Sequence, residues 1–158
     1  MSNCHTIHIL CFGNVLHSDD GFGEAVYHAL NSTQLPKEAA VYNVGVAGLN
    51  ALSLFENCRY VILIDALRYG AEIGQLHDFD PDKEGFYDQE LDTGHQAGLL
   101  YLLHAVKSIV HPSPTITVMG VTIQDVHAFN IGLSPIIAAA VPLTVDKIIE
   151  KISHWNGE

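Results

Sequence analysis

Four residues of this sequence combine a reactive side chain with a position at the edge of a predicted element. Asp19 and Asp20 follow the first apolar run and precede a helical pattern. Asp65 closes a buried apolar run, and His95 opens a later helix. Two carboxylates and one imidazole suit a divalent transition ion such as Zn²⁺ or Ni²⁺ better than Ca²⁺, which prefers oxygen alone. With three protein ligands and an open position, such an ion can polarise a carbonyl or activate water.

The same side chains also have plausible structural roles. Asp19 and Asp20 stand at a helix start, where carboxylates accept bonds from free amides and meet the positive end of the helix dipole. A capping box at 93–96 surrounds His95, and we expect this imidazole to be neutral near pH 7 because a helix N-terminus disfavours its cation. Gly21 lies in the first helical turn, where a glycine lowers helix stability by about 1 kcal/mol relative to alanine. This cost indicates that a bound peptide approaches the backbone closely there.

Composition limits the classes of function. The chain has 158 residues, so we expect a single domain over 1–158. Eighteen acidic against seven basic residues give a net charge of −11, which disfavours nucleic-acid binding. No apolar run approaches the roughly 18 residues that a membrane span needs. The first apolar run lacks a basic leader and a small-residue cleavage site, so we expect a strand there and a cytoplasmic protein.

Strand-like and helix-like patterns alternate along the chain. The expected strands cover 6–12, 40–44, 60–64, 72–79 and 115–121, and the expected helices cover 22–30, 49–55, 95–110 and 135–152. The polar stretch 80–93 is expected to be a surface excursion. The alternation predicts an α/β fold: a single-domain three-layer sandwich with an open, mostly parallel twisted sheet and helices on both faces. Such sheets bind ligands beyond the carboxyl ends of their strands, where the four residues fall.

Five short motifs follow one another along nearly the whole chain. Residues 12–23 read FGNVLHSDDGFG, residues 64–66 read IDA, and residues 95–99 read HQAGL. Residues 132–135 and 140–142 add GLSP and AVP. In this order they resemble the GN-x-L-x-x-D-[DE]-G, Asp-Ala, His-Gln-x-Gly-Leu and closing segments of the hydrogenase maturation endopeptidases. That family trims the C-terminal extension of the large subunit of nickel-iron hydrogenases.

The resemblance implies an endopeptidase that acts on the nickel-loaded large-subunit precursor of a [NiFe] hydrogenase. It implies that Asp20, Asp65 and His95 bind nickel carried by the substrate, and that no organic cofactor takes part. As catalytic residues they would hold the scissile bond beside an ion that polarises the carbonyl or lowers the pKa of a water. We expect substrate contacts from Asn14, Asp19, Gly21, Gly45 and Gly48.

Three positions depart from the family pattern, and two other functions stay open. Cys11 occupies the place of a glycine, Val46 that of a threonine and Ile73 that of a proline. One alternative is a nickel-dependent maturation chaperone that binds the precursor without cutting it. The other is a Mg²⁺-dependent phosphoacceptor receiver domain, which also has an acidic pair after strand one and an aspartate after strand three. The receiver fits less well because the fifth strand ends without a lysine to hold a phosphoryl group.

Overall fold

The computed structural model of this chain describes residues 5–68, 70, 72–83, 86, 95–124 and 129–157, with the backbone alone at 95–97. Within these ranges the strands are β1 (Ile7–Phe12), β2 (Ala39–Gly45), β3 (Tyr60–Leu67), β4 (Leu76–Phe79) and β5 (Thr115–Thr122). The helices are the 3₁₀ segments η1 (Ser18–Gly21) and η2 (Gly48–Phe55) and the α-helices α1 (Phe22–Asn31), α2 (His95–Ile109) and α3 (Pro135–Asn156).

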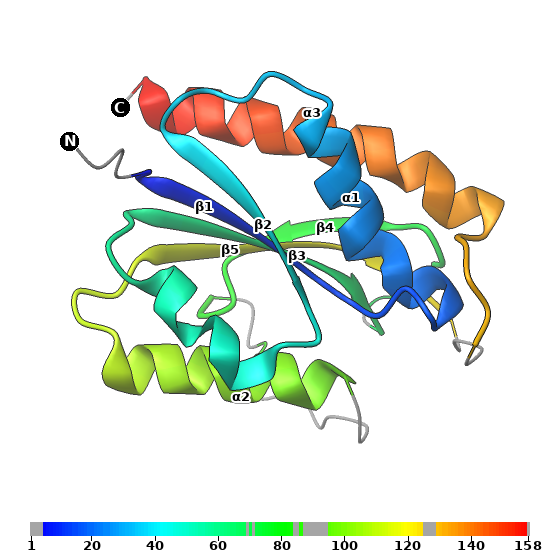
Figure 1. Ribbon diagram of the computed structural model, residues 1–158, viewed down its shortest axis with the longest axis horizontal. Coiled ribbons are helices and arrows are strands. Elements are labelled where there is room, and N and C mark those ends of the chain that lie inside the picture. Colours follow the sequence, from blue (N-terminus) through cyan, green and yellow to red (C-terminus); the bar gives the residue numbers. More distant parts are fainter. Residues whose placement is uncertain are drawn as a thin grey trace.

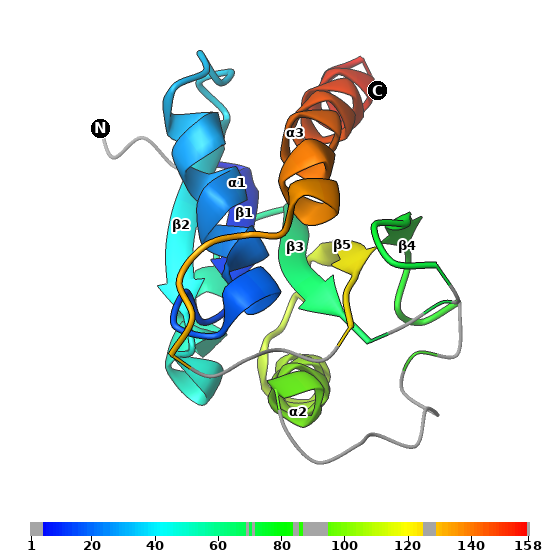
Figure 2. The same ribbon diagram turned by 90° about the vertical axis from the view of Figure 1, so that its right-hand side faces the viewer.

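The strands form one twisted sheet in the order β2-β1-β3-β5-β4 (Figure 1). All neighbouring pairs are parallel except β4, which runs antiparallel to β5 at the edge. Helices α1 and α3 cover one face of the sheet, and η2 and α2 cover the other, as Figures 1 and 2 show. The predicted three-layer α/β arrangement with a mostly parallel sheet is therefore confirmed.

The central strands supply two apolar cores, one on each face. Every residue of β1 and β3 is buried, which is typical of strands covered on both sides. Along β3, Ile62 and Ile64 pack toward α1 and α3, whereas Val61 and Leu63 pack toward α2. The predicted inner face of α2 is confirmed, since Leu99, Leu102, Leu103 and Val106 are buried, as is Val110 after the helix; Leu100 is buried as well. Among the described residues, no helix is long and apolar enough to cross a membrane.

Two strand boundaries differ from the predicted ones by more than one residue. Strand β3 continues past Ile64 to Leu67 because β5 runs beside it as far as Thr122. Asp65 therefore lies inside β3, opposite Gly120, and the prediction that it ends the strand is wrong. Strand β4 begins at Leu76 rather than at residue 72, because a turn over 72–75 with a left-handed Gly74 (φ +86°) precedes it.

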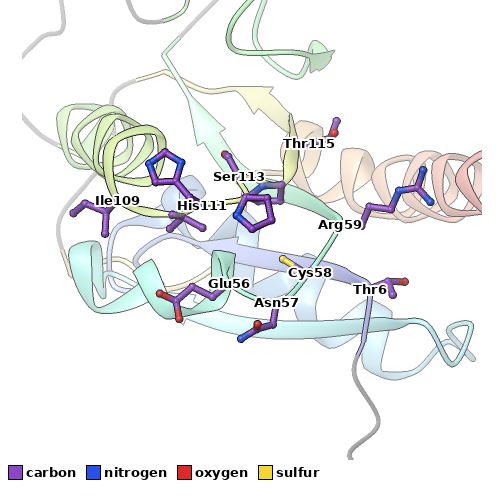
Figure 3. A pocket seen from close by; sticks show the side chains of 12 residues that line it. Thr6, Glu56, Asn57, Cys58, Arg59, Ile109, His111, Ser113 and Thr115 are labelled. Carbon is purple, nitrogen blue, oxygen red and sulfur yellow. The ribbon is translucent and has the colours of Figure 1, made fainter.

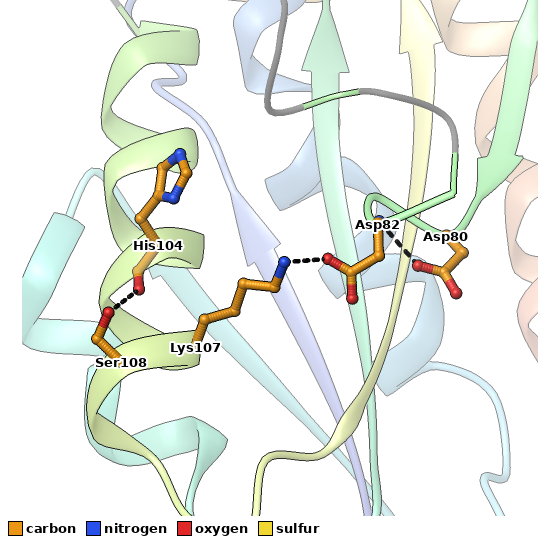
Figure 4. A network of polar contacts seen from close by, with 5 residues as sticks. All are labelled: Asp80, Asp82, His104, Lys107 and Ser108. Carbon is orange, nitrogen blue, oxygen red and sulfur yellow. Dashed lines mark hydrogen bonds and ion pairs between the residues drawn. The ribbon is translucent and has the colours of Figure 1, made fainter.

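The predicted surface excursion contains a buried anchor. Phe86 is fully buried in the core beneath α2, with its ring 5.3 Å from that of Phe79. An ion pair joins Lys107 of α2 to Asp82 (Figure 4). Residues 84, 85 and 87–93, which include the threonine of the predicted capping box, lie outside the described residues. This polar stretch therefore contacts α2 through Asp82 and enters the core through Phe86, so it is not only a surface excursion.

Candidate functional site

The strand order reverses between β1 and β3, because the connections that follow these neighbouring strands leave in opposite directions along the sheet. The chain passes from β1 through α1 to β2 on one face, and returns from β2 through η2 to β3 on the other. A crevice at such a switch point is the usual ligand site of an open α/β sheet. The pairing of β1 with β3 ends at Cys11 and Ile64, so Asp65 is the first residue of β3 beyond this pairing. Asp65 therefore stands where the fold favours a binding site.

Asp20 lies in η1, directly after the loop that leaves β1. Its side chain is only 6% exposed, and its carboxylate accepts a hydrogen bond from the Asn14 N–H at 3.1 Å. The Asp20 carbonyl accepts a bond from the same N–H, also at 3.1 Å. Gly13 has a φ of +142°, and a Cβ there would overlap the Asp20 carbonyl oxygen. A glycine at position 13 thus allows η1 to fold closely back, and η1 contacts β3.

Asp65 borders a small pocket between β1, the β2–η2 turn and α2. The residue is 1% exposed, and its Oδ1 accepts the N–H of Ala66 at 2.8 Å. The pocket has a volume of about 140 Å³ and is lined by Phe12, Gly45, Val46, Gly48, Asp65, Gly98, Leu99 and Leu102. Its walls are mostly apolar, and glycines from two segments, the β2–η2 turn and α2, line it together with Asp65. A carboxylate buried in this way favours a cationic or hydrogen-bonding ligand.

His95 is the first residue of α2, and its side chain lies outside the described ones. Gly98 and Leu99 follow three and four positions later and line the Asp65 pocket. The first two turns of α2 therefore border this pocket. Among the side chains that are described, no group of three His, Cys, Asp or Glu residues forms a metal site. The His95 side chain is outside that search.

The five predicted substrate-contact residues divide into two groups. Gly45 and Gly48 line the Asp65 pocket and have left-handed φ values of +62° and +55°. Asn14 instead orders its own loop, since its Oδ1 accepts the Leu16 N–H at 3.0 Å. At Gly21, a Cβ would stand 3.2 Å from the Cα of Val15, so loop packing also requires a small residue there.

Asp19 points away from this pocket toward the start of α3. Its two carboxylate oxygens accept bonds from Ser134, one from the backbone N–H at 2.7 Å and one from Oγ at 2.9 Å. Ser134 is the predicted N-cap of α3, but its own hydroxyl makes no capping bond within the helix. Asp19 thus caps a distant helix. The Ser-Pro motif revealed the helix start, whereas nothing in the sequence indicated its partner.

Cys11 lies close to Asp65 but is not a nucleophile. Burial raises the pKa of its thiol far above the usual range, and the negative charge of Asp65 raises this pKa further. The thiol is therefore neutral at physiological pH, and Cys11 packs as a small apolar residue of the α1 and α3 core.

A larger pocket lies at the opposite edge of the sheet. It has a volume of about 610 Å³ and is lined by segments that precede β1, β3 and β5, among them Cys58, Arg59 and His111 (Figure 3). Arg59 and His111 are exposed, and the Cys58 thiol lies 3.8 Å from the Leu54 carbonyl. This edge carries none of the residues that the sequence motifs single out.

Comparisons with known proteins agree with the fold and with the motifs. A family model described as hydrogenase maturation protease matches residues 25–151. The hydrogenase expression/formation protein HupD of Rhodobacter capsulatus is 24% identical over 152 residues, covering 95% of this chain and 72% of that protein. The hydrogenase maturating endopeptidase HybD from E. coli has a TM-score of 0.81 at 24% identity, covering 94% of this chain and 92% of that one.

A second solved structure, an endopeptidase from Escherichia coli, has a TM-score of 0.78 at 25% identity and covers 90% of this chain and 88% of its own. The phosphoacceptor receiver alternative is not supported, because the family model that matches residues 25–151 describes a hydrogenase maturation protease. With most of its length matched by that model and its fold shared with known maturation endopeptidases, the chain belongs to the hydrogenase maturation protease family.

Proposed function

We propose that this protease removes the C-terminal extension from the nickel-loaded precursor of a [NiFe] hydrogenase large subunit. In this proposal Asp20, Asp65 and His95 recognise nickel carried by the precursor, and no organic cofactor takes part. The family supplies the class of reaction, and the motif residues supply the candidate ligands. Nickel is then part of the substrate, and its presence reports that the precursor is ready for cleavage.

One observation carries the proposal: three segments distant in sequence meet at the switch point of the sheet. The η1 segment with Asp20 contacts β3, and Asp65 lies in β3 directly after the last residue that pairs with β1. The first turns of α2, which begins at His95, border the Asp65 pocket. Two oxygens and one nitrogen from these segments suit Ni²⁺. A divalent ion would also offset the cost of burying two carboxylates.

The chemistry follows from this donor set. Nickel bound there polarises the scissile carbonyl or lowers the pKa of an adjacent water. Asp20 or Asp65 accepts a proton as the water oxygen bonds to the carbonyl carbon, and the proton passes to the leaving nitrogen as the C–N bond breaks. The neutral, buried Cys11 thiol favours attack by water over a route through a cysteine acyl-enzyme.

The test uses purified protease and uncleaved large-subunit precursor, with and without nickel. Mass spectrometry should show loss of the C-terminal extension from the nickel-loaded precursor alone. Asp20→Ala, Asp65→Ala and His95→Ala should each abolish this loss while retaining the circular dichroism spectrum of the folded protein. Asp146→Ala, on the exposed surface of α3, is the matched control and should cleave normally.

Two outcomes would contradict the proposal in different ways. Stable binding of the nickel-loaded precursor without any mass loss would favour the non-cleaving chaperone. Full activity in all three site variants would show that the cleavage chemistry resides elsewhere in the chain.

A further inference from the structure

Exposed apolar side chains border the carboxyl edge of the sheet beside η1. We call residues 129–134, which lead into α3, the strap. The apolar rim consists of Val15, Leu16, Phe129, Ile131 and Ile136, all exposed. Phe129 is 87% exposed and Ile131 74%, although both precede a helix with a well-buried inner face. Such a cluster is typical of a surface that binds another molecule.

Two hollows flank the strap. One has a volume of about 540 Å³ and lies toward Ile73 and Ile136, and the other has about 210 Å³ and lies toward Val15 and Ala25. Ser18, Ile131, Gly132 and Leu133 line both hollows. The two hollows therefore share the strap as a common wall, with the exposed side chain of Ile131 between them.

Hydrogen bonds hold the strap in place. The Ser18 N–H donates to the Asn130 carbonyl at 2.7 Å, and the Asn130 N–H donates to the Leu16 carbonyl at 3.1 Å. Ser134 is fixed by Asp19, as described above. Phe129 also has a φ of +60°, which is unfavourable for a bulky residue and persists only where surrounding contacts impose it. The contacts around the strap thus hold Phe129 in this backbone conformation.

The charges around the hollows select the kind of partner. Their described lining includes Asp19, Glu24 and His28, which lies 3.6 Å from Glu24, but neither lysine nor arginine, and the whole chain carries a net charge of −11. A basic partner is therefore attracted to this surface, and a second copy of the same acidic chain is repelled. The strap is bonded to η1, which holds Asp20, so a docked segment lies next to the candidate site.

We propose that the apolar rim and its two hollows dock an apolar segment of the hydrogenase large-subunit precursor that is flanked by lysine or arginine. This inference rests on the proposed function and adds the surface that binds the body of the substrate. The rim supplies apolar contact area, the acidic hollows attract the basic flanks, and the strap places the docked segment beside Asp20. Docking there contributes to precursor affinity rather than to bond cleavage.

The test compares a rim variant with a matched control. The rim variant is Phe129→Ser with Ile131→Ser, and the control is Tyr101→Ser with Ile109→Ser, which removes two exposed apolar side chains from α2. Binding is measured with metal-free precursor, which the proposed mechanism leaves uncleaved, and turnover with nickel-loaded precursor. The rim variant should raise Kd and KM at least about tenfold. Its kcat, and all constants of the control, should stay within about twofold of wild type.

Three results would overturn the inference. Unchanged Kd and KM in the rim variant, with normal cleavage by the wild type, would remove the docking surface and leave the proposed function intact. A wild-type protein that neither binds nor cleaves the precursor would remove both. A wild-type dimer in analytical ultracentrifugation that the rim variant converts to monomer would assign the surface to a second copy of the chain.

Discussion

Asp19 joins two segments that lie 115 positions apart, and its replacement tests whether this link stabilises the fold. Asp19→Ala removes the acceptor for the Ser134 N–H at 2.7 Å and for its Oγ at 2.9 Å. Both bonds are part-buried and involve a carboxylate at the start of a 22-residue helix. Bonds to charged groups contribute about 1.5–3 kcal/mol each when buried. Because these two are partly exposed, we expect Asp19→Ala to lower the free energy of unfolding by about 2–3 kcal/mol in total.

Two milder variants separate the contributions to this figure. Ser134→Ala removes only the hydroxyl bond and should cost about 1 kcal/mol. Asp19→Asn keeps an acceptor for the N–H and offers an N–H to the hydroxyl, but it loses the charge at the helix start. It should also cost about 1 kcal/mol. The double variant of Asp19→Ala and Ser134→Ala should be less destabilised than the sum of the single variants, because they share a bond.

Urea unfolding at pH 7, monitored by circular dichroism, measures these differences. For a domain of this size, the Asp19→Ala change should also lower Tm by roughly 5–10 °C. A free energy of unfolding within about 0.5 kcal/mol of wild type would refute the reasoning, since surface changes without a specific contact stay within that range. Equal losses for Asp19→Ala and Ser134→Ala would show that the backbone N–H bond contributes nothing.

Three further changes test the packing around the site. Phe86→Ala should lower the free energy of unfolding by about 3–5 kcal/mol, because this ring is fully buried beneath α2. Urea unfolding measures this loss and so tests whether Phe86 anchors its segment to the core. A cost below about 1 kcal/mol would mean that α2 does not depend on it. Gly13→Ala should abolish precursor cleavage and lower stability, since its Cβ would overlap the Asp20 carbonyl, and normal cleavage would show that η1 can move away without loss. The Cys11 thiol has a raised pKa in the folded state, so above about pH 9 the unfolded chain ionises while the folded chain does not. Stability relative to Cys11→Ala should then fall by about 1.4 kcal/mol per pH unit above pH 9, and a pH-independent difference would contradict burial of the thiol.

Local patterns in the sequence determine most of the elements. Helix α2 follows from apolar residues at helical spacing, and β3 follows from an unbroken apolar run. The Ser-Pro motif marks the start of α3 because the fixed φ of Pro135 suits a first helical turn, although Ser134 makes no capping bond within the helix. The motif residues by themselves also indicate the family, since Asp20, Asp65 and His95 stand in order within short segments.

Contacts between distant segments determine the rest. Strand β3 extends past Asp65 because β5 continues beside it, and no local pattern encodes the length of a partner strand. Asp19 binds Ser134, and Phe86 enters the core, through contacts that depend on the path of the whole chain. The Asp65 pocket likewise needs a strand, a glycine turn and a helix to meet. Short-range periodicity records which face of an element is apolar, whereas the partner of each face depends on packing in three dimensions.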